Sequence, residues 1–284
     1  MDYIHKERFP LPDVSIIIPV RIDHADRKEN LQTLLRYFST FFSSLDIFVV
    51  EAGTEKTCEE IAHNFQTQYE FLYTEDPFPK CRLVNRAASA SLRNIIAMHD
   101  VDVLFHPQAI VTLVEAFRQN PRCAYGLPYN GVFLDVDEPT RSALVATFDF
   151  SKVPLVISGE LHRNYAPGVV CVNPYSVGGA NYFRSTTFWE LGGFNEHFVS
   201  CVWEDYEMEA RFVKMGYPPA VIKDANALHL HHKRVSDEET KQYEEFNRRL
   251  YESICNMTRE ELADYIQKEL LPGNPRRSEV TKEE

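Results

Sequence analysis

The sequence lacks any apolar run that approaches the roughly 20 residues needed to cross a bilayer. Its opening residues, 1–10, contain no apolar signal region. The six cysteines are scattered and form no C-x-x-C pair, which fits reduced thiols better than a disulfide framework or a thiolate zinc site. We therefore expect a cytoplasmic protein.

Positive charge is also scarce. The chain has 30 Lys and Arg against 42 Asp and Glu, a formal net charge of −12, and this excess argues against a general nucleic-acid binder. An anionic ligand would need local cations or a bound metal to offset the field of the whole protein. The 284 residues show no internal repeat and suffice for one large or two small domains with a full core.

The first part of the chain alternates buried strands with amphipathic helices. Residues 14–20 read V-S-I-I-I-P-V, a β-branched run typical of a buried parallel strand. We predict strands at 14–20, 46–50, 69–73 and 94–98, and helices at 28–42, 55–66, 82–91 and 107–119. This order predicts a parallel, three-layer α/β sheet.

Four polar residues follow the carboxyl ends of these predicted strands, namely Arg21, Glu51, Asp100 and Asp102. Ligands of such sheets bind outside the carboxyl ends of the strands. We therefore expect the four side chains to converge on one crevice, with Asp102 at an exposed strand end.

The second part of the chain is less regular. Residues 126–174 are rich in turns, and we interpret them as an irregular insertion. Helices are predicted at 185–191 and from Trp203 to a C-cap at Gly216, and a strand from Val221 leads toward a group of histidines. The charged residues after 236 predict helices to about 270, and 272–284 resemble a disordered tail.

The helix that begins at Trp203 carries Glu204, Asp205 and Glu207 in its first turn. The simplest explanation is structural, because carboxylates at a helix N-terminus gain about 0.3–1 kcal/mol from the macrodipole. A glycine pair upstream, the adjacent tryptophan, a D-x-D motif and the histidine group favour a functional explanation.

The D-x-D motif, Asp100-Val101-Asp102, offers hard oxygen ligands of the kind that Mg²⁺ or Mn²⁺ takes together with substrate phosphates. The motif alone also suits any polar turn. His229, His231 and His232 add nitrogen ligands, and imidazole with carboxylate favours Mn²⁺ while leaving Mg²⁺ open.

These motifs, in this order, resemble those of GT-A fold glycosyltransferases, more narrowly the β-1,4-galactosyltransferase family and its bacterial relatives in family 2. Residues 19–21 match the P-F-R that ends the first strand of that family. Residues 78–85 are similar to its F-N-R-A-K-L-L-N, and 100–103 match its D-V-D-L. Residues 178–181 and 192–194 resemble its G-G-V-S and N-G-F.

Two further motifs carry the resemblance. Glu204-Asp205 matches the family's E-D pair, and His229-x-x-His232 is similar to its metal-binding M-x-x-H. Trp203 departs from the pattern because it adjoins the pair, whereas two glycines intervene in the family, and Tyr206 replaces an aspartate. Both departures are on the acceptor side, so the acceptor identity is not carried over.

The resemblance implies a mostly parallel, Rossmann-like GT-A sheet flanked by helices, with a helical C-terminal extension. The glycosyltransferase domain would span 1–235, with a nucleotide-binding half at about 1–105 and an acceptor-side half at about 106–235. The extension and tail would span 236–284.

The resemblance also implies roles for individual residues. Asp205 would be the catalytic base, and Glu204 would bind the acceptor beside Trp203. Mn²⁺ or Mg²⁺ would bind at Asp102, His229 and His232. The implied donor-binding residues are Arg21, Glu51, Phe78, Lys80, Arg82, Asp100, Val101, Asp102 and Gly179; among them, Phe78 and Lys80 would hold the uracil and the phosphates.

The implied reaction is the inverting, metal-dependent transfer of a hexose or N-acetylhexosamine from a UDP-sugar to a hydroxyl of a saccharide acceptor. The donor stays open among UDP-galactose, UDP-N-acetylgalactosamine and UDP-glucose types. By analogy with cytoplasmic enzymes of this kind, the acceptor would be a lipid-linked saccharide of a surface-polysaccharide pathway. Such an acceptor would allow peripheral association with the inner face of the membrane.

Two other readings remain. A nucleotidyltransferase also uses carboxylates, a metal and an α/β sheet, but it usually has a glycine-rich loop after the first strand, and here P-V-R-I-D-H contains no glycine. A non-catalytic sugar-nucleotide-binding protein is the other alternative. The presence of Asp102, Asp205 and His232 together argues against it.

Overall fold

The computed structural model describes residues 8–153, 155–156, 164–166, 169–173, 175–230, 232–233 and 237–271. His231 and the expected disordered tail at 272–284 lie outside this part of the chain. None of the helices in these ranges is long and apolar enough to span a membrane.

A seven-stranded sheet forms the centre of the molecule, in the order β13-β8-β12-β6-β2-β4-β5. Strands β6, β2, β4 and β5 run parallel, whereas β12 is antiparallel to both β6 and β8. The expected mostly parallel sheet is confirmed. Its strands are β2 (Val14–Val20), β4 (Asp46–Gly53), β5 (Gln68–Tyr73), β6 (Ile95–His99), β8 (Tyr125–Leu127), β12 (Ala180–Arg184) and β13 (Ala220–Val221).

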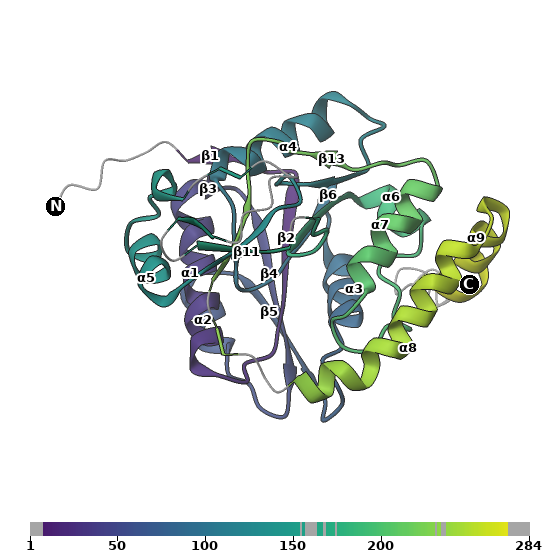
Figure 1. The fold of residues 1–284 in the computed structure, drawn as a ribbon, viewed down its shortest axis with the longest axis horizontal. Helices are drawn as coiled ribbons and strands as arrows, with labels where there is room; N and C mark the ends of the chain where they lie inside the picture. Colours follow the sequence, from purple (N-terminus) through teal and green to yellow (C-terminus); the bar gives the residue numbers. More distant parts are fainter. Residues whose placement is uncertain are drawn as a thin grey trace.

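Helices cover both faces of this sheet. In Figure 1, α1 and α5 lie on one side of the central strands, and α3, α6 and α7 lie on the other. The helices are α1 (Ala25–Phe41), α2 (Glu59–Asn64), α3 (Lys80–Ala90), α4 (Pro107–Gln119), α5 (Glu138–Thr147), α6 (Ser185–Glu190), α7 (Glu204–Lys214), α8 (Asp237–Asn256) and α9 (Arg259–Tyr265). Short helical turns follow at Phe150–Lys152 and Ile266–Leu270.

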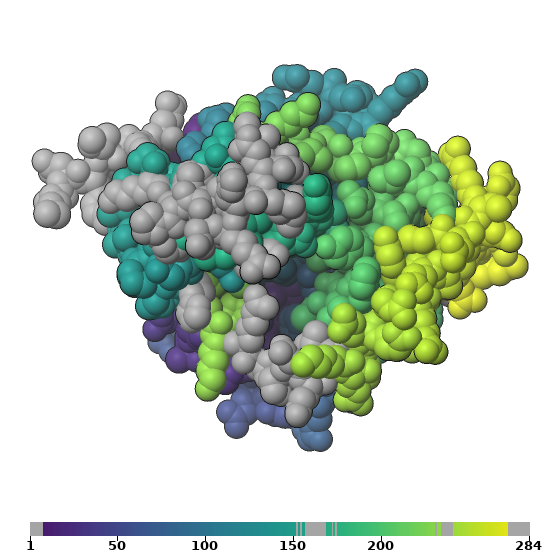
Figure 2. All heavy atoms as spheres, in the orientation of Figure 1, coloured from purple at the N-terminus to yellow at the C-terminus, as the bar shows by residue number. Residues whose placement is uncertain are grey.

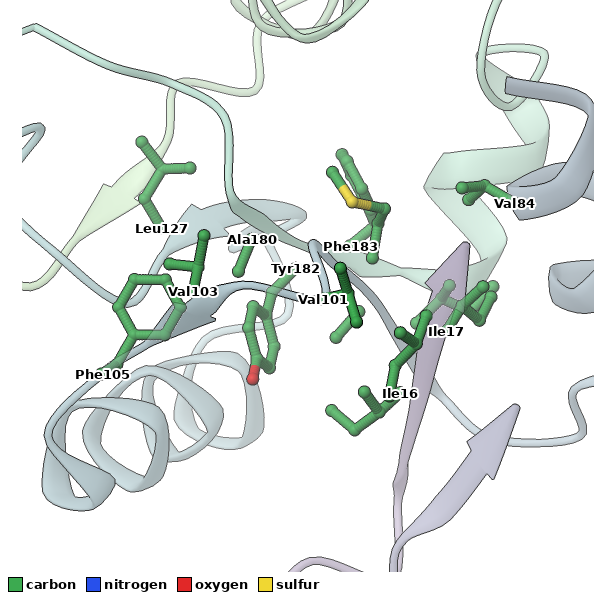
Figure 3. Close-up of a cluster of buried hydrophobic side chains, with 14 of the residues drawn as sticks. Ile16, Ile17, Val84, Val101, Val103, Phe105, Leu127, Ala180, Tyr182 and Phe183 are labelled. Atoms are coloured by element: carbon green, nitrogen blue, oxygen red, sulfur yellow. The ribbon is translucent and has the colours of Figure 1, made fainter. Parts of the chain in front are cut away.

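The core explains why β2 has no polar face. Every residue of β2 is buried, because helices pack on both faces of a parallel sheet. Figure 3 shows Ile16 and Ile17 of β2 together with Tyr182 and Phe183 of β12 and Val84 of α3. All five residues are fully buried. Each fully buried aliphatic or aromatic side chain contributes about 1.5–3 kcal/mol to the free energy of unfolding.

The stretch that we expected to be an irregular insertion contains β9, β10 and β11, three strands of a second, five-stranded sheet with the order β10-β11-β9-β14-β7. That expectation is wrong, because β9 finds its partner β14 far along the chain, and no local pattern reveals such a pairing. The same stretch contains α5, whose N-cap Asp137 accepts a hydrogen bond from Thr140 N. The strands are β7 (Val103–Leu104), β9 (Phe133–Val136), β10 (Asn164–Ala166), β11 (Val169–Asn173) and β14 (Ala227–Leu230); β1 (Phe9–Pro10) and β3 (Phe42–Ser43) form a separate pair.

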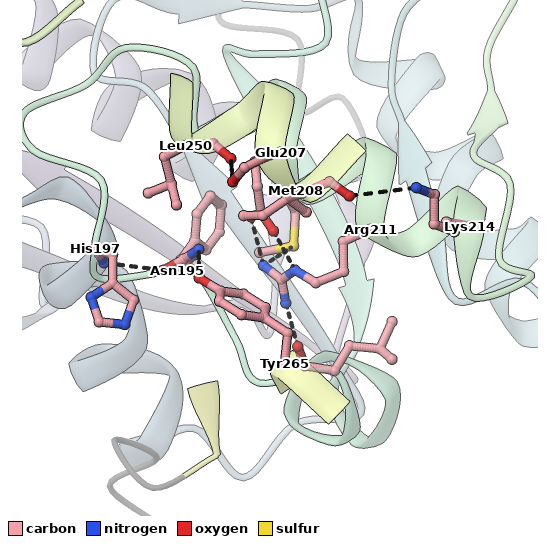
Figure 4. Close-up of polar contacts among 12 residues, drawn as sticks. Asn195, His197, Glu207, Met208, Arg211, Lys214, Leu250 and Tyr265 are labelled. Atoms are coloured by element: carbon pink, nitrogen blue, oxygen red, sulfur yellow. Dashed lines mark hydrogen bonds and ion pairs between the residues drawn. The ribbon is translucent and has the colours of Figure 1, made fainter. Parts of the chain in front are cut away.

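The C-terminal helices pack against the rest of the molecule. Figure 2 shows the yellow-green atoms of α8 and α9 along one edge of this face, beside the green atoms of α7. In Figure 4, Asn195 donates to the hydroxyl of Tyr265, at 3.0 Å, and Arg211 of α7 bonds to Glu207. The domain boundary at 235 remains a prediction.

Candidate active site

A cavity of about 610 Å³ lies at the carboxyl ends of the central strands and extends to the start of α7. Twelve of the fourteen expected site residues line it, from Arg21 and Phe78 to His229 and His232, and the two exceptions are Glu51 and Arg82. A second cavity, of about 630 Å³, is lined mainly by apolar side chains such as Phe41 and Phe148. Among the described residues, the ligand atoms close enough to hold a metal lie in the first cavity.

Strand pairing builds the candidate metal centre. Strand β14 pairs antiparallel with β7, which places His229 opposite Val103, directly after Asp102. Leu230 N donates to Asp102 O at 2.7 Å and ties the two segments together. Leu230 faces the core and is 0 % exposed. The strand ends there, and His232 reaches the same point from the following loop.

The three side chains present one ligand atom each within 4.8 Å of one another. His232 Nε2 lies 3.2 Å from Asp102 Oδ2, and His229 Nε2 lies 3.8 Å from Asp102 Oδ1. Two imidazoles and a carboxylate form a donor set that suits Mn²⁺ and also accepts Mg²⁺. The residues present therefore fit the metal that the sequence predicts.

A residue that we did not expect orients the first of these histidines. Asp135 of β9 contacts His229 Nδ1 through its carboxylate, and the two residues are register partners in parallel strands. His232 Nδ1 lies 3.0 Å from the carbonyl oxygen of Lys233. Bonds of this kind hold a metal-ligating imidazole with its other nitrogen toward the ion. The sequence signal for Asp135 was the alternation F-L-D-V, inside the stretch interpreted as irregular.

Asp102 is 7 % exposed, so the expected exposed strand end is wrong. The small sheet covers this position, since β14 pairs directly with β7. Burial works to raise the pKa of Asp102, but a hydrogen bond from His232 and the charge of His229 hold it well below its usual range. The same bond to Asp102 raises the pKa of His232.

A second cluster forms around Lys80, the first residue of α3. Its Nζ lies 2.9 Å from Glu204 Oε1, 3.1 Å from Asp205 Oδ2 and 3.3 Å from Asp100 Oδ1. Lys80 is 3 % exposed. Burial works against its ammonium form, yet the three carboxylates raise the pKa of Lys80 well above its usual range. The cluster joins α3, the D-x-D loop and α7.

The two carboxyl oxygens of Asp205 have different surroundings. Oδ2 bonds to Lys80, whereas Oδ1 is buried and has no hydrogen-bond partner in the described part of the chain. Burial raises the pKa of Asp205 to about 8, with Glu204 and Asp100 adding to the rise and Lys80 opposing it. A carboxyl group with a pKa this close to neutrality is suited to exchange a proton with a bound hydroxyl.

The glycine pair that precedes β12 serves side-chain packing in this structure. A Cβ at Gly178 would lie 2.7 Å from Asp205 Oδ2, and a Cβ at Gly179, with φ +81°, would lie 2.7 Å from the ring of Phe133. The resemblance implies that Gly179 of this pair binds the donor, a role that remains a prediction. The atoms that approach the pair are those of Asp205 and Phe133, although both glycines also border the cavity.

Arg21 and Phe78 border the cavity on the donor side. The guanidinium carbon of Arg21 lies 5.7 Å from the centre of the Phe78 ring, and Arg21 Nη2 donates to the carbonyl of Asp76 at 2.7 Å. Val101 is 3 % exposed, in the wall of the cavity between the two aspartates.

Two expected donor residues do not line the cavity. Glu51 is 1 % exposed, and its carboxylate accepts from the backbone N–H groups of Thr57 and Cys58 and, at 2.6 Å, from the hydroxyl of Tyr69. It therefore fastens the start of α2. Arg82 is exposed on α3, away from the residues that line the cavity, because α3 begins at Lys80 and turns the side chain of Arg82 to another face.

Trp203 and Tyr206 line the cavity beside the start of α7. The backbone of Trp203 has φ +73°, a left-handed conformation that non-glycine residues rarely adopt. The indole stacks on Tyr251 of α8, with ring centres 5.2 Å apart, and also contacts Tyr206 at 5.6 Å. An aromatic surface next to Glu204 and Asp205 is thereby fixed by the C-terminal helix.

Solved structures share this fold. Glucosyl-3-phosphoglycerate synthase from Mycobacterium tuberculosis, in complex with UDP, matches with a TM-score of 0.55 and 13 % identity over 87 % of this chain and 81 % of that chain. Its complex with Mn²⁺, UDP and phosphoglyceric acid gives 0.54 and 12 %, over 87 % and 79 %. The mannosyltransferase PcManGT from Pyrobaculum calidifontis, with GDP-Man and Mn²⁺, gives 0.53 and 16 %, over 92 % and 72 %. At these identities the likeness shows the fold alone.

Sequence comparison adds the family. None of the curated proteins searched matches the chain. The family model described as glycosyltransferase like family 2 matches residues 15–266, which include both carboxylate clusters and the histidines. The narrower resemblance to β-1,4-galactosyltransferases remains a prediction. The chain belongs to the glycosyltransferase family 2-like proteins, and its fold is that of GT-A glycosyltransferases.

Proposed function

We propose that this glycosyltransferase moves a hexose or N-acetylhexosamine from a UDP-sugar to a hydroxyl of a saccharide acceptor, with inversion and with a divalent metal. One observation carries the proposal. A single cavity joins the Asp102, His229 and His232 group to the carboxyl group of Asp205. The first group can hold a nucleotide diphosphate through a metal, and the second can receive a proton.

The donor side supports a nucleotide. Arg21 and Phe78 supply a cation and an aromatic ring at the edge of the cavity, next to Asp100 and Asp102. Mn²⁺ or Mg²⁺ at Asp102, His229 and His232 would offset the charge that develops on the leaving diphosphate. Structures of the same fold contain UDP in one enzyme and GDP-Man in another, and we propose UDP on the strength of the motif resemblance.

Asp205 would accept the proton that the acceptor hydroxyl loses during transfer. As the acceptor oxygen bonds to the anomeric carbon, the bond from that carbon to the donor phosphate oxygen breaks, and the acceptor hydroxyl proton passes to the carboxylate of Asp205. Attack in line with the leaving group inverts the anomeric centre. Glu204 would bind another hydroxyl of the acceptor sugar.

The acceptor wall favours a saccharide without a phosphate at the reacting end. Trp203 and Tyr206 offer aromatic surface, and Glu204 and Asp205 offer acceptors for hydroxyl groups. Lys80, the cation beside them, already contacts three carboxylates. An anionic acceptor would therefore meet net negative charge. By analogy, the proposal extends to a lipid-linked saccharide in surface-polysaccharide synthesis, with peripheral membrane association.

A donor panel tests the proposal. UDP-galactose, UDP-N-acetylgalactosamine, UDP-glucose, UDP-N-acetylglucosamine and GDP-mannose would each be supplied with Mn²⁺, and nucleotide release would be measured with and without a mixture of saccharide acceptors. We expect release from one UDP-sugar that requires the metal and rises with acceptor. Release from GDP-mannose alone would overturn the UDP assignment, and binding without any turnover would indicate a non-catalytic protein.

A further inference from the structure

Lys80 contacts the acceptor-side carboxylates instead of pointing its charge into open space for a phosphate. Its Nζ lies within 3.3 Å of oxygens on Asp100, Glu204 and Asp205. The side chain is 4 % exposed. The motif resemblance implies that this lysine binds donor phosphates, whereas the geometry points to a different task.

The hydrogen-bonding capacity of the ammonium is already used. A lysine ammonium has three N–H donors, and three carboxylate oxygens surround this one at hydrogen-bond or ion-pair distance. A phosphate oxygen would have to displace one of them. Asp100 is the farthest of the three carboxylates and the most exposed. A ligand could therefore replace its contact with Lys80 at the lowest free-energy cost.

The contact to Asp205 fixes one of its two oxygens. Oδ2 lies 3.1 Å from Lys80 Nζ and packs against Gly178, where even a Cβ would come within 2.7 Å. Oδ1 has no hydrogen-bond partner among the residues that the structure describes. The carboxyl group is thus held through Oδ2 between a cation and a glycine, and its orientation depends on Lys80.

We propose that Lys80 is a positioning residue for the proton acceptor: its ammonium binds Asp205 Oδ2 and holds the carboxyl group in place at the wall of the cavity. The inference rests on the proposed function, in which Asp205 is the base. It links the donor side to the acceptor side, since the same α3 that carries Lys80 begins directly after Phe78 and Pro79.

The charged groups around Asp205 shift its pKa, so the inference can be tested by titration of this carboxyl group. The titratable groups that face it are Lys80 on α3, Asp100 after β6, Glu204 on its own helix and Tyr129 after β8. Burial, Glu204 and Asp100 raise the pKa of Asp205, whereas Lys80 lowers it. Removal of the ammonium and removal of a carboxylate should therefore move this pKa in opposite directions.

The experiment titrates Asp205 directly, without any substrate. The protein would be labelled with ¹³C at the aspartate carboxyl carbons, and the Asp205 signal would be identified by its loss in Asp205→Asn. In Lys80→Met the pKa of Asp205 should rise by about 1 or more, since a cation at this range typically lowers a carboxyl pKa by about 1–3. Glu204→Gln should lower it, and Lys80→Arg should stay close to wild type.

A matched control and a second variant complete the design. Lys268→Met removes another lysine of an ion pair, one that is 67 % exposed, and should leave the pKa of Asp205 in place. If Lys80→Met does not fold, Lys80→Gln gives the same measurement with a hydrogen-bond donor retained. An Asp205 pKa that does not move in the folded neutral variant would overturn the inference.

Kinetics and calorimetry distinguish a lysine that positions Asp205 from one that binds the donor phosphates. At pH 7 the transfer kcat of Lys80→Met should fall at least tenfold, while calorimetry with UDP and Mn²⁺ should show a Kd changed less than threefold. The opposite split, a Kd weakened tenfold or more with an unchanged Asp205 pKa, would assign Lys80 to the phosphates alone. Failure of the wild-type enzyme to transfer any sugar would refute the proposed function, whereas the titration of Asp205 would still report the hold of Lys80 on that carboxyl group.

Discussion

Asp102 is both a candidate metal ligand and a buried partner of His232, so its substitution should affect metal binding and stability. Asp102→Ala should abolish Mn²⁺-dependent UDP binding. It should also destabilise the protein by about 1–3 kcal/mol, since His232 loses its acceptor in a buried place. Calorimetry with UDP and Mn²⁺, beside a urea unfolding curve, measures both effects. Unchanged affinity for UDP and Mn²⁺ would remove Asp102 from the metal site.

Asp135 should influence metal affinity without touching the metal. Its carboxylate holds His229 Nδ1 and so leaves Nε2 toward Asp102. Asp135→Asn should weaken Mn²⁺ binding about 10–100-fold, the usual effect of losing such an orienting partner. The control is Asp137→Asn, which alters the nearby cap of α5 and should leave Mn²⁺ affinity as it was. Equal effects of the two substitutions would contradict the orienting role.

His99 makes stability depend on pH. Burial lowers its pKa to about 3, and its ring nitrogens have no hydrogen-bond partner within the described ranges. The unfolded chain binds a proton at about pH 6.5, so this group's contribution to stability is complete above that value and is lost as the pH falls toward 3.

The corresponding test replaces His99 with phenylalanine, which suits neighbours such as Phe38 and Phe105. Wild type should lose about 2 kcal/mol more than His99→Phe between pH 7.5 and pH 5, at about 1.4 kcal/mol per pH unit below 6.5. Urea unfolding at the two pH values measures the difference. Parallel losses in both proteins would show that His99 does not titrate on unfolding.

At the scale of elements, α8 holds the loop that leads into α7. Asn247 of α8 is 0 % exposed, and its side chain donates to the carbonyls of Val199 and Val202 and accepts from Val199 N. Tyr251, one turn further along, stacks on Trp203. The left-handed backbone of Trp203 is strained, and these contacts from α8 keep it in place.

Asn247→Ala should therefore raise the acceptor KM while leaving UDP and Mn²⁺ affinity near wild type, since the donor contacts lie on other elements. The three broken hydrogen bonds should also cost about 1–3 kcal/mol of stability. Arg249→Ala, an exposed change on the same helix, is the control. A lower melting temperature with an unchanged acceptor KM would limit Asn247 to a structural role.

The sequence predicts elements well where the signal is local. The buried run of β2, the start of α4 at Pro107 and the acidic first turn of α7 were all found from neighbouring residues. The small sheet was missed because His229 and its partner Asp135 are 94 positions apart. Glu51, placed by its strand end, and Arg82, placed by its motif, do not line the cavity because side-chain direction is not encoded in either signal, and their donor roles remain predictions.

At the scale of the whole molecule, the net charge of −12 requires that an anionic donor be bound with compensating charge. The cavity meets this need with Arg21 and with a group that fits a divalent cation, both on the donor side. Lys80 offsets Asp100 of the D-x-D motif and the carboxylates of Glu204 and Asp205. In the proposed function, this distribution of charge would allow phosphate binding and proton removal in one cavity.

The central claim is that these two sides act together in sugar transfer, with Asp205 as the base. The most direct test is the single-turnover transfer rate of Asp205→Asn with the donor and acceptor identified by the panel, beside its affinity for UDP and Mn²⁺. The account predicts a rate lower by about 10²–10⁴-fold with nearly unchanged affinity for UDP. A transfer rate close to that of the wild-type enzyme would contradict it.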